Sequence, residues 1–440
     1  MTYTASLVPV DTVRLENGLF VVLSADHTVP VVAVNLWYHV GSANERAGRT
    51  GFAHLFEHML FQGSAQVGAN EHFELVQRAG GTLNGSTWLD RTNYFETLPA
   101  HQLALGLWLE ADRMGALLPA MTQEKLDTQR DVVKNERRWT VDNQPYGTWW
   151  ERLPALCFPE EHPFHHSLIG SMEDLSAASL EDVAEFFRTY YTPDNAVLTI
   201  AGDFEREEAE RLVREYFGPI ARGNGRPPLA PMELPPRFGD WRREVVPDDV
   251  AVPRVFLAFR SPVFGRDGYY AASLCTAILG TGRGSRLYRT LVRDRQLASM
   301  ATAFTFDLAK GTDLLVIDAT ARPGVTAEAL EEGIVSLVDT MCRVGVSDEE
   351  RARVTALEEM AFVSSLQSAG ERADRLSRFA TYLGDARLVN EHLPRLREVS
   401  TDDITAFARD YLGPDNRATL WYVPRDPDPA VPASEEVGAS

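Results

Sequence analysis

Apolar positions in the first hundred residues fall into strand-like and helix-like patterns. Residues 10–26 read VDTVRLENGLFVVLSAD, which predicts two short strands around an Asn17–Gly18 turn. Residues 31–42 predict a buried strand, and residues 82–99 a pair of strands. Helical spacing predicts helices over 51–61, 70–81, 103–118 and 122–139. This irregular order of strands and helices favours an α+β fold over a regular alternation.

A repeat late in each half of the chain predicts an internal duplication. Residues 180–204 and 400–424 each predict an amphipathic helix, a Pro-Asp-Asn turn and a strand. An offset of 221 aligns the two turns, and it also pairs Phe186 with Phe407 and Tyr190 with Tyr411. Agreement at one offset indicates two homologous domains with an α/β layer each.

The predicted domain limits follow from composition. We expect an N-terminal domain over residues 1–220 and a homologous C-terminal domain over 241–425. Residues 221–240 are dense in Pro and Gly, which predicts an exposed and fairly stiff linker. Residues 426–440 are rich in Pro, Ala and Glu and are predicted to be disordered.

Charge and cysteine content narrow the class of protein. The formal net charge of −20 argues against nucleic acid and anionic membrane surfaces as partners. No apolar run approaches the roughly 18 residues of a spanning helix, and the first residues lack a secretory signal pattern. Three widely spaced cysteines suit a reducing compartment, so we predict a cytoplasmic protein.

The helix predicted over 51–61 carries the strongest chemical signal. Its sequence, GFAHLFEHMLF, places His54 and His58 four residues apart, so both imidazoles lie on one helix face and can reach one ion. Glu57 lies close to the same face, where it can contact a water molecule without binding the metal. The order H-x-x-E-H inverts the common zinc peptidase motif. Two satisfied core histidines with a solvated glutamate are the alternative.

A catalytic zinc site needs a third protein ligand. The helix predicted over 122–139 offers Glu136, whose neighbours at −4 and −7 are Val132 and Gln129. Glu136 therefore continues a face that is otherwise apolar or neutral. Spacing alone makes Glu136 a candidate for the third ligand and does not exclude other acidic residues from that role.

Longer motifs resemble a known family. Four segments are similar to segments of the pitrilysin/insulinase family of zinc peptidases, in particular the bacterial relatives of mitochondrial processing peptidase. These segments are GRTGFAHLFEHMLFQGS, GGTLNGSTWLDRTNYFETLP, LEADRM and QRDVVKNERR. The resemblance implies one Zn²⁺ per chain, held by His54, His58 and Glu136, with Glu57 as the general base. A second acid of the family falls on Gln129, so the helping role of that acid is not expected here.

The resemblance also implies the substrate, a peptide or an unfolded polypeptide enclosed in a chamber. Small residues at the centre of the first strand within 82–99 suit close approach of a substrate backbone. The tentative contacts are Asn84, Gly85, Ser86 and Thr87, and an ordinary, weakly packed inner strand is the alternative.

The second half departs from the family pattern. Active members carry an arginine and, seven residues later, a tyrosine, but these positions are Val292 and Ser299 in this chain. Arg293 comes one residue late, which turns its side chain by about 100° on a helix. We therefore expect a heterodimer in which a homologous subunit, lacking H-x-x-E-H, supplies the Arg/Tyr pair. A non-catalytic scaffold or chaperone-like subunit and a self-sufficient homodimeric peptidase are the alternatives.

Two further clusters each allow two interpretations. The cluster of His162, His165 and His166 is a candidate for a second metal site, but the intervening Pro163 favours a loop. Trp139, Trp149 and Trp150 suit either a substrate chamber or core packing.

Overall fold

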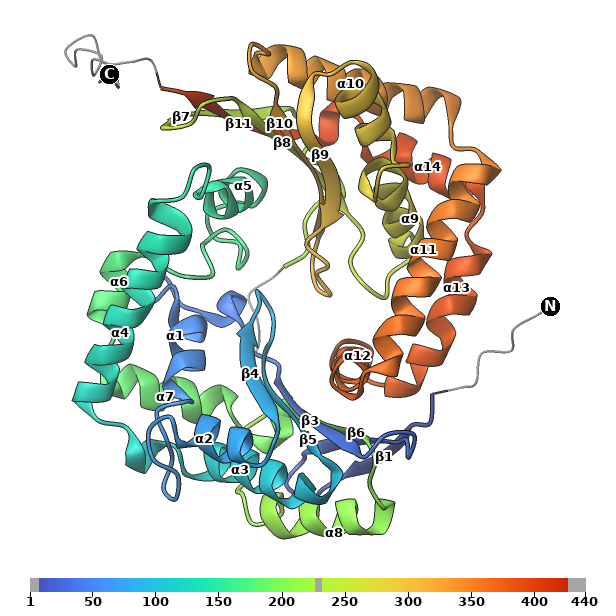
Figure 1. Ribbon diagram of the computed structural model, residues 1–440. Coiled ribbons are helices and arrows are strands. Elements are labelled where there is room, and N and C mark those ends of the chain that lie inside the picture. The colour runs from blue at the N-terminus through green and yellow to red at the C-terminus, as the bar shows by residue number, and fades with distance from the viewer. Residues whose placement is uncertain (1–7, 226–231, 426–440) are drawn as a thin grey trace, which may run out of the picture.

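Two mixed β-sheets, one in each half of the chain, form the frame of the structure (Figure 1). The computed structural model describes residues 8–225 and 232–425, so the tail predicted over 426–440 lies outside the described residues. No helix within these ranges has the length and apolar character that crossing a membrane requires.

The first sheet has the order β1-β2-β6-β3-β5-β4. Strands β2 and β6 pair in parallel, and the other neighbours are antiparallel. β4 lies at one edge and pairs with β5. The strands of this sheet are β1 (Asp11–Arg14), β2 (Phe20–Ala25), β3 (Val31–Tyr38), β4 (Thr82–Thr87), β5 (Thr92–Pro99) and β6 (Ala196–Gly202).

The second sheet repeats this topology with the order β7-β11-β8-β10-β9. Strands β7 and β11 pair in parallel and the rest are antiparallel, as in β2-β6-β3-β5-β4. The predicted duplication and the α+β class are therefore confirmed. The strands are β7 (Arg242–Asp248), β8 (Arg254–Ser261), β9 (Ala298–Thr305), β10 (Asp313–Ala321) and β11 (Ala418–Pro424).

Helices form at the predicted segments of the first half. The capping residue Ser179 begins α7 and exchanges hydrogen bonds with Asp182, and Ser400 and Asp403 repeat this arrangement at α14. The helices of the first half are α1 (Phe52–Met59), α2 (Glu71–Arg78), α3 (Leu103–Ala116), α4 (Gln123–Arg137), α5 (Trp149–Cys157), α6 (Met172–Ala177), α7 (Leu180–Tyr190) and α8 (Arg206–Phe217). Those of the second half are α9 (Tyr269–Gly280), α10 (Ala327–Val344), α11 (Asp348–Gln367), α12 (Ala369–Leu383), α13 (His392–Glu398) and α14 (Thr401–Tyr411).

The two halves exchange helices. α12 of the second half packs on β3 and β6 of the first sheet, while α5 of the first half packs on β8 and β11 of the second sheet (Figure 1). Ala33, Ala201 and Ala373 are buried together at the first contact, where small side chains let α12 approach the sheet closely. Each half therefore completes the packing of the other.

Polar contacts fix the position of α12 on the first sheet. Arg372 forms a 2.6 Å ion pair with Asp26, and the indole nitrogen of Trp37 donates to Asp374 at 3.0 Å. Residues 226–231 of the predicted linker lie outside the described residues. Of the described linker residues, Met232 is buried, whereas Glu233, Pro235 and Pro236 beside it are exposed.

Candidate metal centre

Helix α1 presents its apolar side to the core and its polar side to α4 and β4. Phe52, Leu55, Phe56 and Met59 are buried in the core of the first half. The side chains of His54 and His58 are 13% and 23% exposed, so both are mostly removed from solvent yet reachable. The amphipathic spacing seen in the sequence therefore orients both histidines toward one opening.

The start of α1 is held by contacts with distant residues. Gly51 begins the helix at φ +82°, and a Cβ at this residue would lie 2.4 Å from the carbonyl oxygen of Ile169, so only glycine fits. The buried carboxylate of Glu45 accepts hydrogen bonds from the backbone N–H groups of Gly51 and Ala53, at 2.9 and 2.7 Å. A negative charge there also suits the helix dipole. His166 lies 3.0 Å from the same carboxylate.

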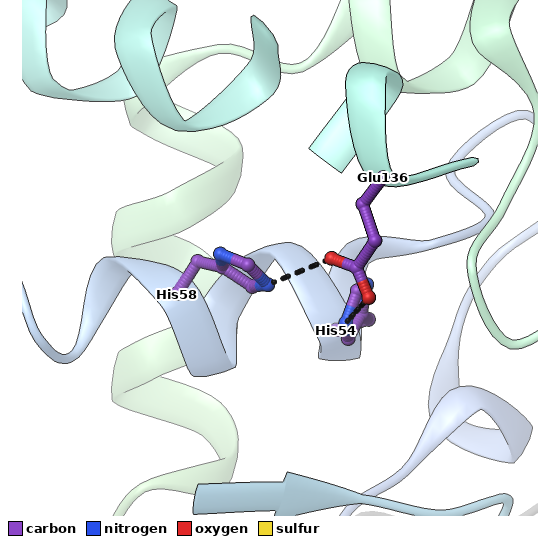
Figure 2. Close-up of side chains that lie close together, drawn as sticks. All are labelled: His54, His58 and Glu136. Carbon is purple, nitrogen blue, oxygen red and sulfur yellow. Dashed lines mark ion pairs between the residues drawn. The ribbon is translucent and has the colours of Figure 1, made fainter. Parts of the chain in front are cut away.

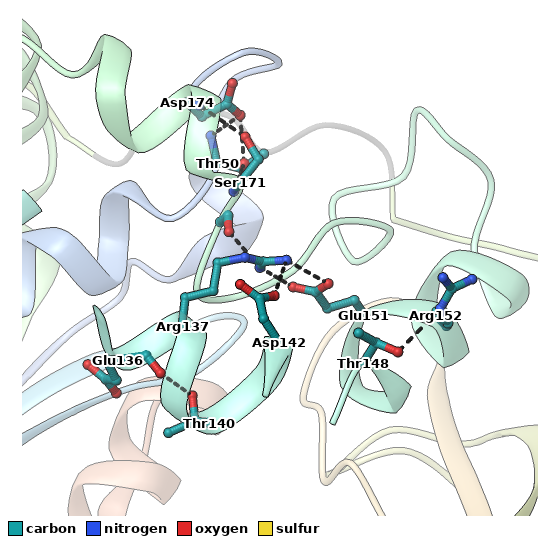
Figure 3. Close-up of polar contacts among 11 residues, drawn as sticks. Thr50, Glu136, Arg137, Thr140, Asp142, Thr148, Glu151, Arg152, Ser171 and Asp174 are labelled. Carbon is teal, nitrogen blue, oxygen red and sulfur yellow. Dashed lines mark hydrogen bonds and ion pairs between the residues drawn. The ribbon is translucent and has the colours of Figure 1, made fainter. Parts of the chain in front are cut away.

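Helix α4 brings Glu136 to the histidines from another part of the chain. Thr122 caps its start, and Leu126 and Val133 bury its apolar face. At its end, Arg137 forms ion pairs with Glu151 and Asp142 and donates to a backbone carbonyl of the 167–171 loop at 2.8 Å (Figure 3). This anchoring fixes the last turn of α4, from which the side chain of Glu136 projects.

The three predicted ligand residues converge. Each carboxylate oxygen of Glu136 lies near one imidazole, at 3.7 Å from Nε2 of His54 and 3.4 Å from Nε2 of His58 (Figure 2). Tetrahedral zinc with ligands at about 2.0–2.2 Å separates neighbouring ligand atoms by about 3.4 Å. Within the described residues, this is the one group of three such side chains placed to share an ion. The residues present therefore fit zinc.

Burial and charge set the protonation of the site. Burial lowers the pKa of His54 to about 4, which keeps the imidazole neutral and able to bind a metal. The contact with His58 lowers the pKa of Glu136, which favours its carboxylate form. Burial raises the pKa of Glu57, although a hydrogen bond from Thr87 opposes this rise. Glu57 is thus a better proton acceptor than an exposed glutamate.

Strand β4 lies directly over Glu57. The hydroxyl of Thr87 donates to the Glu57 carboxylate at 2.6 Å, and a Cβ on Gly85 would come within 3.2 Å of both Glu57 and Phe61. Ser86 donates to Asn93 of the neighbouring strand at 2.6 Å, while Asn84 is exposed. The four predicted contact residues therefore lie on an edge strand beside the candidate base, and their role with substrate stays a prediction.

The described part of the second half holds no comparable group of metal-binding side chains. Helix α9 has the sequence YYAASLCTAILG and carries no metal-binding side chain besides Cys275. Val292 is buried in the core, and the Ser299 hydroxyl donates to the carbonyl oxygens of Thr320 and Ala321. Arg293 is exposed and pairs with the adjacent acid. Gln129 is buried on α4, where the family's second acid would stand.

The histidine cluster forms separate contacts. His162 lies 3.1 Å from the carbonyl oxygen of Met232, and His165 lies 2.8 Å from that of Phe158. His166 turns instead to Glu45. The loop interpretation therefore fits the geometry, and the histidines do not converge on a second ion.

Glu45 is a supporting residue that the sequence analysis missed, and His166, considered there as a possible metal ligand, contacts Glu45 instead. They are 121 residues apart, and neither belongs to the H-x-x-E-H motif. The one available signal was that each of the two polar residues lies next to an apolar or glycine-rich segment. The sequence does not show that the two residues contact each other, because that contact depends on the fold.

Comparisons with known proteins match most of the chain to one family of peptidases. Residues 20–158 match the family model described as "Insulinase (Peptidase family M16)", and residues 177–357 match "Peptidase M16 inactive domain". The chain is 30% identical over 418 residues to the zinc protease PqqE of Helicobacter pylori, covering 94% of this chain and 93% of the relative.

Two further matches are a solved structure and a subunit of a processing peptidase. A crystal structure of a protease from Helicobacter pylori superposes with a TM-score of 0.90 at 29% identity, covering 95% of this chain and 100% of that chain. The beta subunit of mitochondrial-processing peptidase from Blastocladiella emersonii is 25% identical over 270 residues, which cover 61% of this chain and 56% of the relative.

Proposed function

Because this chain belongs to the insulinase family of M16 peptidases, we propose that it is the zinc-bearing subunit of a metalloendopeptidase. One observation supports the proposal: ligand atoms of His54, His58 and Glu136 all lie within 4.8 Å of one another, close enough to share one zinc ion. The cofactor is one Zn²⁺ per chain, and the substrates are peptides or unfolded segments.

The chemistry divides between the ion and the residues. Bound zinc would polarise the peptide carbonyl and make water more acidic. Glu57 accepts a proton from the attacking water and returns it to the leaving amine, which is general base and then general acid catalysis. Thr87 orients the Glu57 carboxylate through its 2.6 Å hydrogen bond.

Substrate addition to β4 follows from its place at the sheet edge. The backbone of an extended peptide can pair with the free side of β4, as peptides do in β-augmentation. Residues Asn84–Thr87 would then hold the peptide over Glu57. Gly85, which has no side chain, leaves room for that approach.

A homologous partner completes the proposal. Val292 and Ser299 cannot supply a guanidinium and a phenol, so a second subunit has to provide these donors. The Blastocladiella relative is itself named a subunit. Donors that stabilise a developing oxyanion contribute about 2.7–4 kcal/mol each, or a 100- to 1,000-fold rate effect.

The test measures zinc content and peptide hydrolysis of the purified chain, alone and with a homologous subunit carrying the Arg/Tyr pair. We expect one zinc per chain, weak hydrolysis alone and at least a 100-fold increase with the partner. Strong hydrolysis by the chain alone would refute the partner requirement. A chain that binds its partner and never holds zinc would be a scaffold instead.

A further inference from the structure

Polar side chains cross the first sheet from its edge strand β4, over β5 and β3, to helix α12 of the second half (Figure 1). The hydroxyl of Ser86 donates to Oδ1 of Asn93 at 2.6 Å, and Nδ2 of Asn93 donates to Oδ1 of Asn35 at 3.0 Å. Nδ2 of Asn35 then donates to Oδ1 of Asp374 at 3.3 Å. These four residues form one continuous hydrogen-bond chain between β4 and α12.

The carboxylate of Asp374 sets the direction of this hydrogen-bond chain. A carboxylate only accepts hydrogen bonds, so Asn35 has to present Nδ2 to Asp374 and Oδ1 to Asn93. Asn93 in turn presents its Oδ1 to Ser86. Asn35 and Asn93 are 2% and 1% exposed, so neither amide can turn to water instead. Loss of the acceptor on α12 therefore removes the fixed orientation of both amides.

The turn between β4 and β5, residues 88–91, is held by the same helix. Tyr382 of α12 donates to the carboxylate of Asp90 at 2.6 Å, and Asp90 is buried. The guanidinium of Arg91 donates to the carbonyl oxygen of Ser86 at 3.0 Å, which ties the turn to the strand. Helix α12 therefore fixes both the side of β4 and the turn that follows it.

Neighbouring residues of β4 contact opposite faces of the sheet. Ser86 belongs to the hydrogen-bond chain that leads to α12, while Thr87 donates to Glu57 on the other face. Within the described residues, β4 has one strand neighbour, β5, so contacts on the two faces add to this pairing in fixing its position. The backbone that would pair with a peptide thus takes part of its position from the second half.

We propose that α12 positions β4 for substrate, with Asp374 as the positioning residue and Tyr382 as the second contact. The inference rests on the proposed function, which assigns β4 to the peptide, and adds that the second half sets the shape of this strand. Peptide binding and the packing of α12 on the first sheet then favour each other, because coupling between two sites is reciprocal.

Hydrogen exchange of the full-length chain tests the positioning without any substrate. Asp374→Ala should speed amide exchange in residues 82–87 about tenfold, because a hydrogen bond to a charged acceptor is lost. Exchange in residues 52–59 of α1 should stay as in the parent chain. Unchanged exchange in residues 82–87 would overturn the inference. Equal acceleration of both segments would also overturn it, since general loosening would then be the cause.

Three further variants of α12 separate positioning from folding. Asp374→Asn keeps an accepting oxygen and should stay within about threefold of the parent exchange rate, whereas a rate as high as that of Asp374→Ala would contradict the acceptor role. Glu371→Ala removes an exposed acid of the same helix and is the matched control. Tyr382→Phe removes one oxygen and should speed exchange in residues 88–91 about fivefold. This variant decides the matter if Asp374→Ala does not fold, because unchanged exchange in it would refute the inference.

Hydrolysis of dye-labelled casein, an unfolded polypeptide, by the chain with its partner subunit connects the strand to substrate. Asp374→Ala should raise KM about tenfold and leave kcat within about threefold of the parent value. A fall in kcat at constant KM would contradict the role in substrate binding. If the parent chain does not hydrolyse casein, the proposed function fails by itself, and the exchange of residues 82–87 still decides the positioning by α12.

Discussion

The acidity of Glu57 results from opposing effects at one residue. Burial raises the pKa of its carboxyl, and the hydrogen bond from Thr87 lowers it. The sequence predicted Glu57, His54, His58 and Glu136, because short-range helical spacing and a family motif report on them. Their convergence depends on α1 and α4 meeting in space, which spacing within either helix does not encode.

Removal of Glu136 should weaken zinc binding. We expect Glu136→Ala to raise the zinc Kd more than about 100-fold, beyond the usual cost of losing an outer-shell partner. Competition with a chelator of known affinity measures this change. Asp131→Ala, an exposed acid of the same helix, is the control and should bind zinc as the parent chain does. Unaltered affinity in Glu136→Ala would exclude this residue as a ligand.

At the scale of elements, α1 depends on a buried acid outside the helix. Glu45 accepts two hydrogen bonds from the first turn of α1 and contacts His166. The helices and strands predicted within residues 10–139, 180–204 and 400–424 followed from periodicity, and the structure forms them. The capping of α1 was not, since Glu45 lies in a loop and its histidine partner lies in another.

Loss of this cap should destabilise the first half. Glu45→Ala leaves the backbone N–H groups of Gly51 and Ala53 without their acceptor, while His166 keeps its contact with the carbonyl oxygen of Ser42. The loss costs about 1–3 kcal/mol in the free energy of unfolding. Denaturant titration measures the change. Glu185→Ala removes an exposed acid that pairs with Arg46 and should cost under about 1 kcal/mol. Equal effects of the two substitutions would argue against the capping role.

At the scale of the whole molecule, the duplicated halves are joined by exchanged helices. The repeat of residues 180–204 and 400–424 predicted two related domains, and the matching strand orders confirm the duplication. The exchange of α5 and α12 was not predictable. An apolar helix face shows that a helix packs against something, but it does not show which sheet.

The ion pair between Asp26 and Arg372 links the halves and should make their stability depend on pH. Hydrogen bonds from Thr28 and Arg372 lower the pKa of Asp26 to about 2, from 3.8. Its contribution is therefore complete above pH 3.8 and is lost as the pH falls toward 2. Because Asp26 is partly exposed, that contribution is about 1 kcal/mol.

Asp26→Asn should accordingly lower the free energy of unfolding by about 1 kcal/mol at pH 7 and much less at pH 2. Urea titrations of both chains across this range measure the difference. Asp249→Asn, at an exposed acid away from α12, is the control. A difference that stays constant down to pH 2 would rule out the ion pair as its source.

The central claim is that Glu57 acts on peptides at a zinc site formed by His54, His58 and Glu136. The most direct measurement compares hydrolysis by the parent and Glu57→Gln chains, each with the partner subunit and at equal zinc content. The account predicts unchanged zinc binding and a rate lowered by about 100- to 10,000-fold. Hydrolysis by Glu57→Gln at a rate close to that of the parent chain would contradict it.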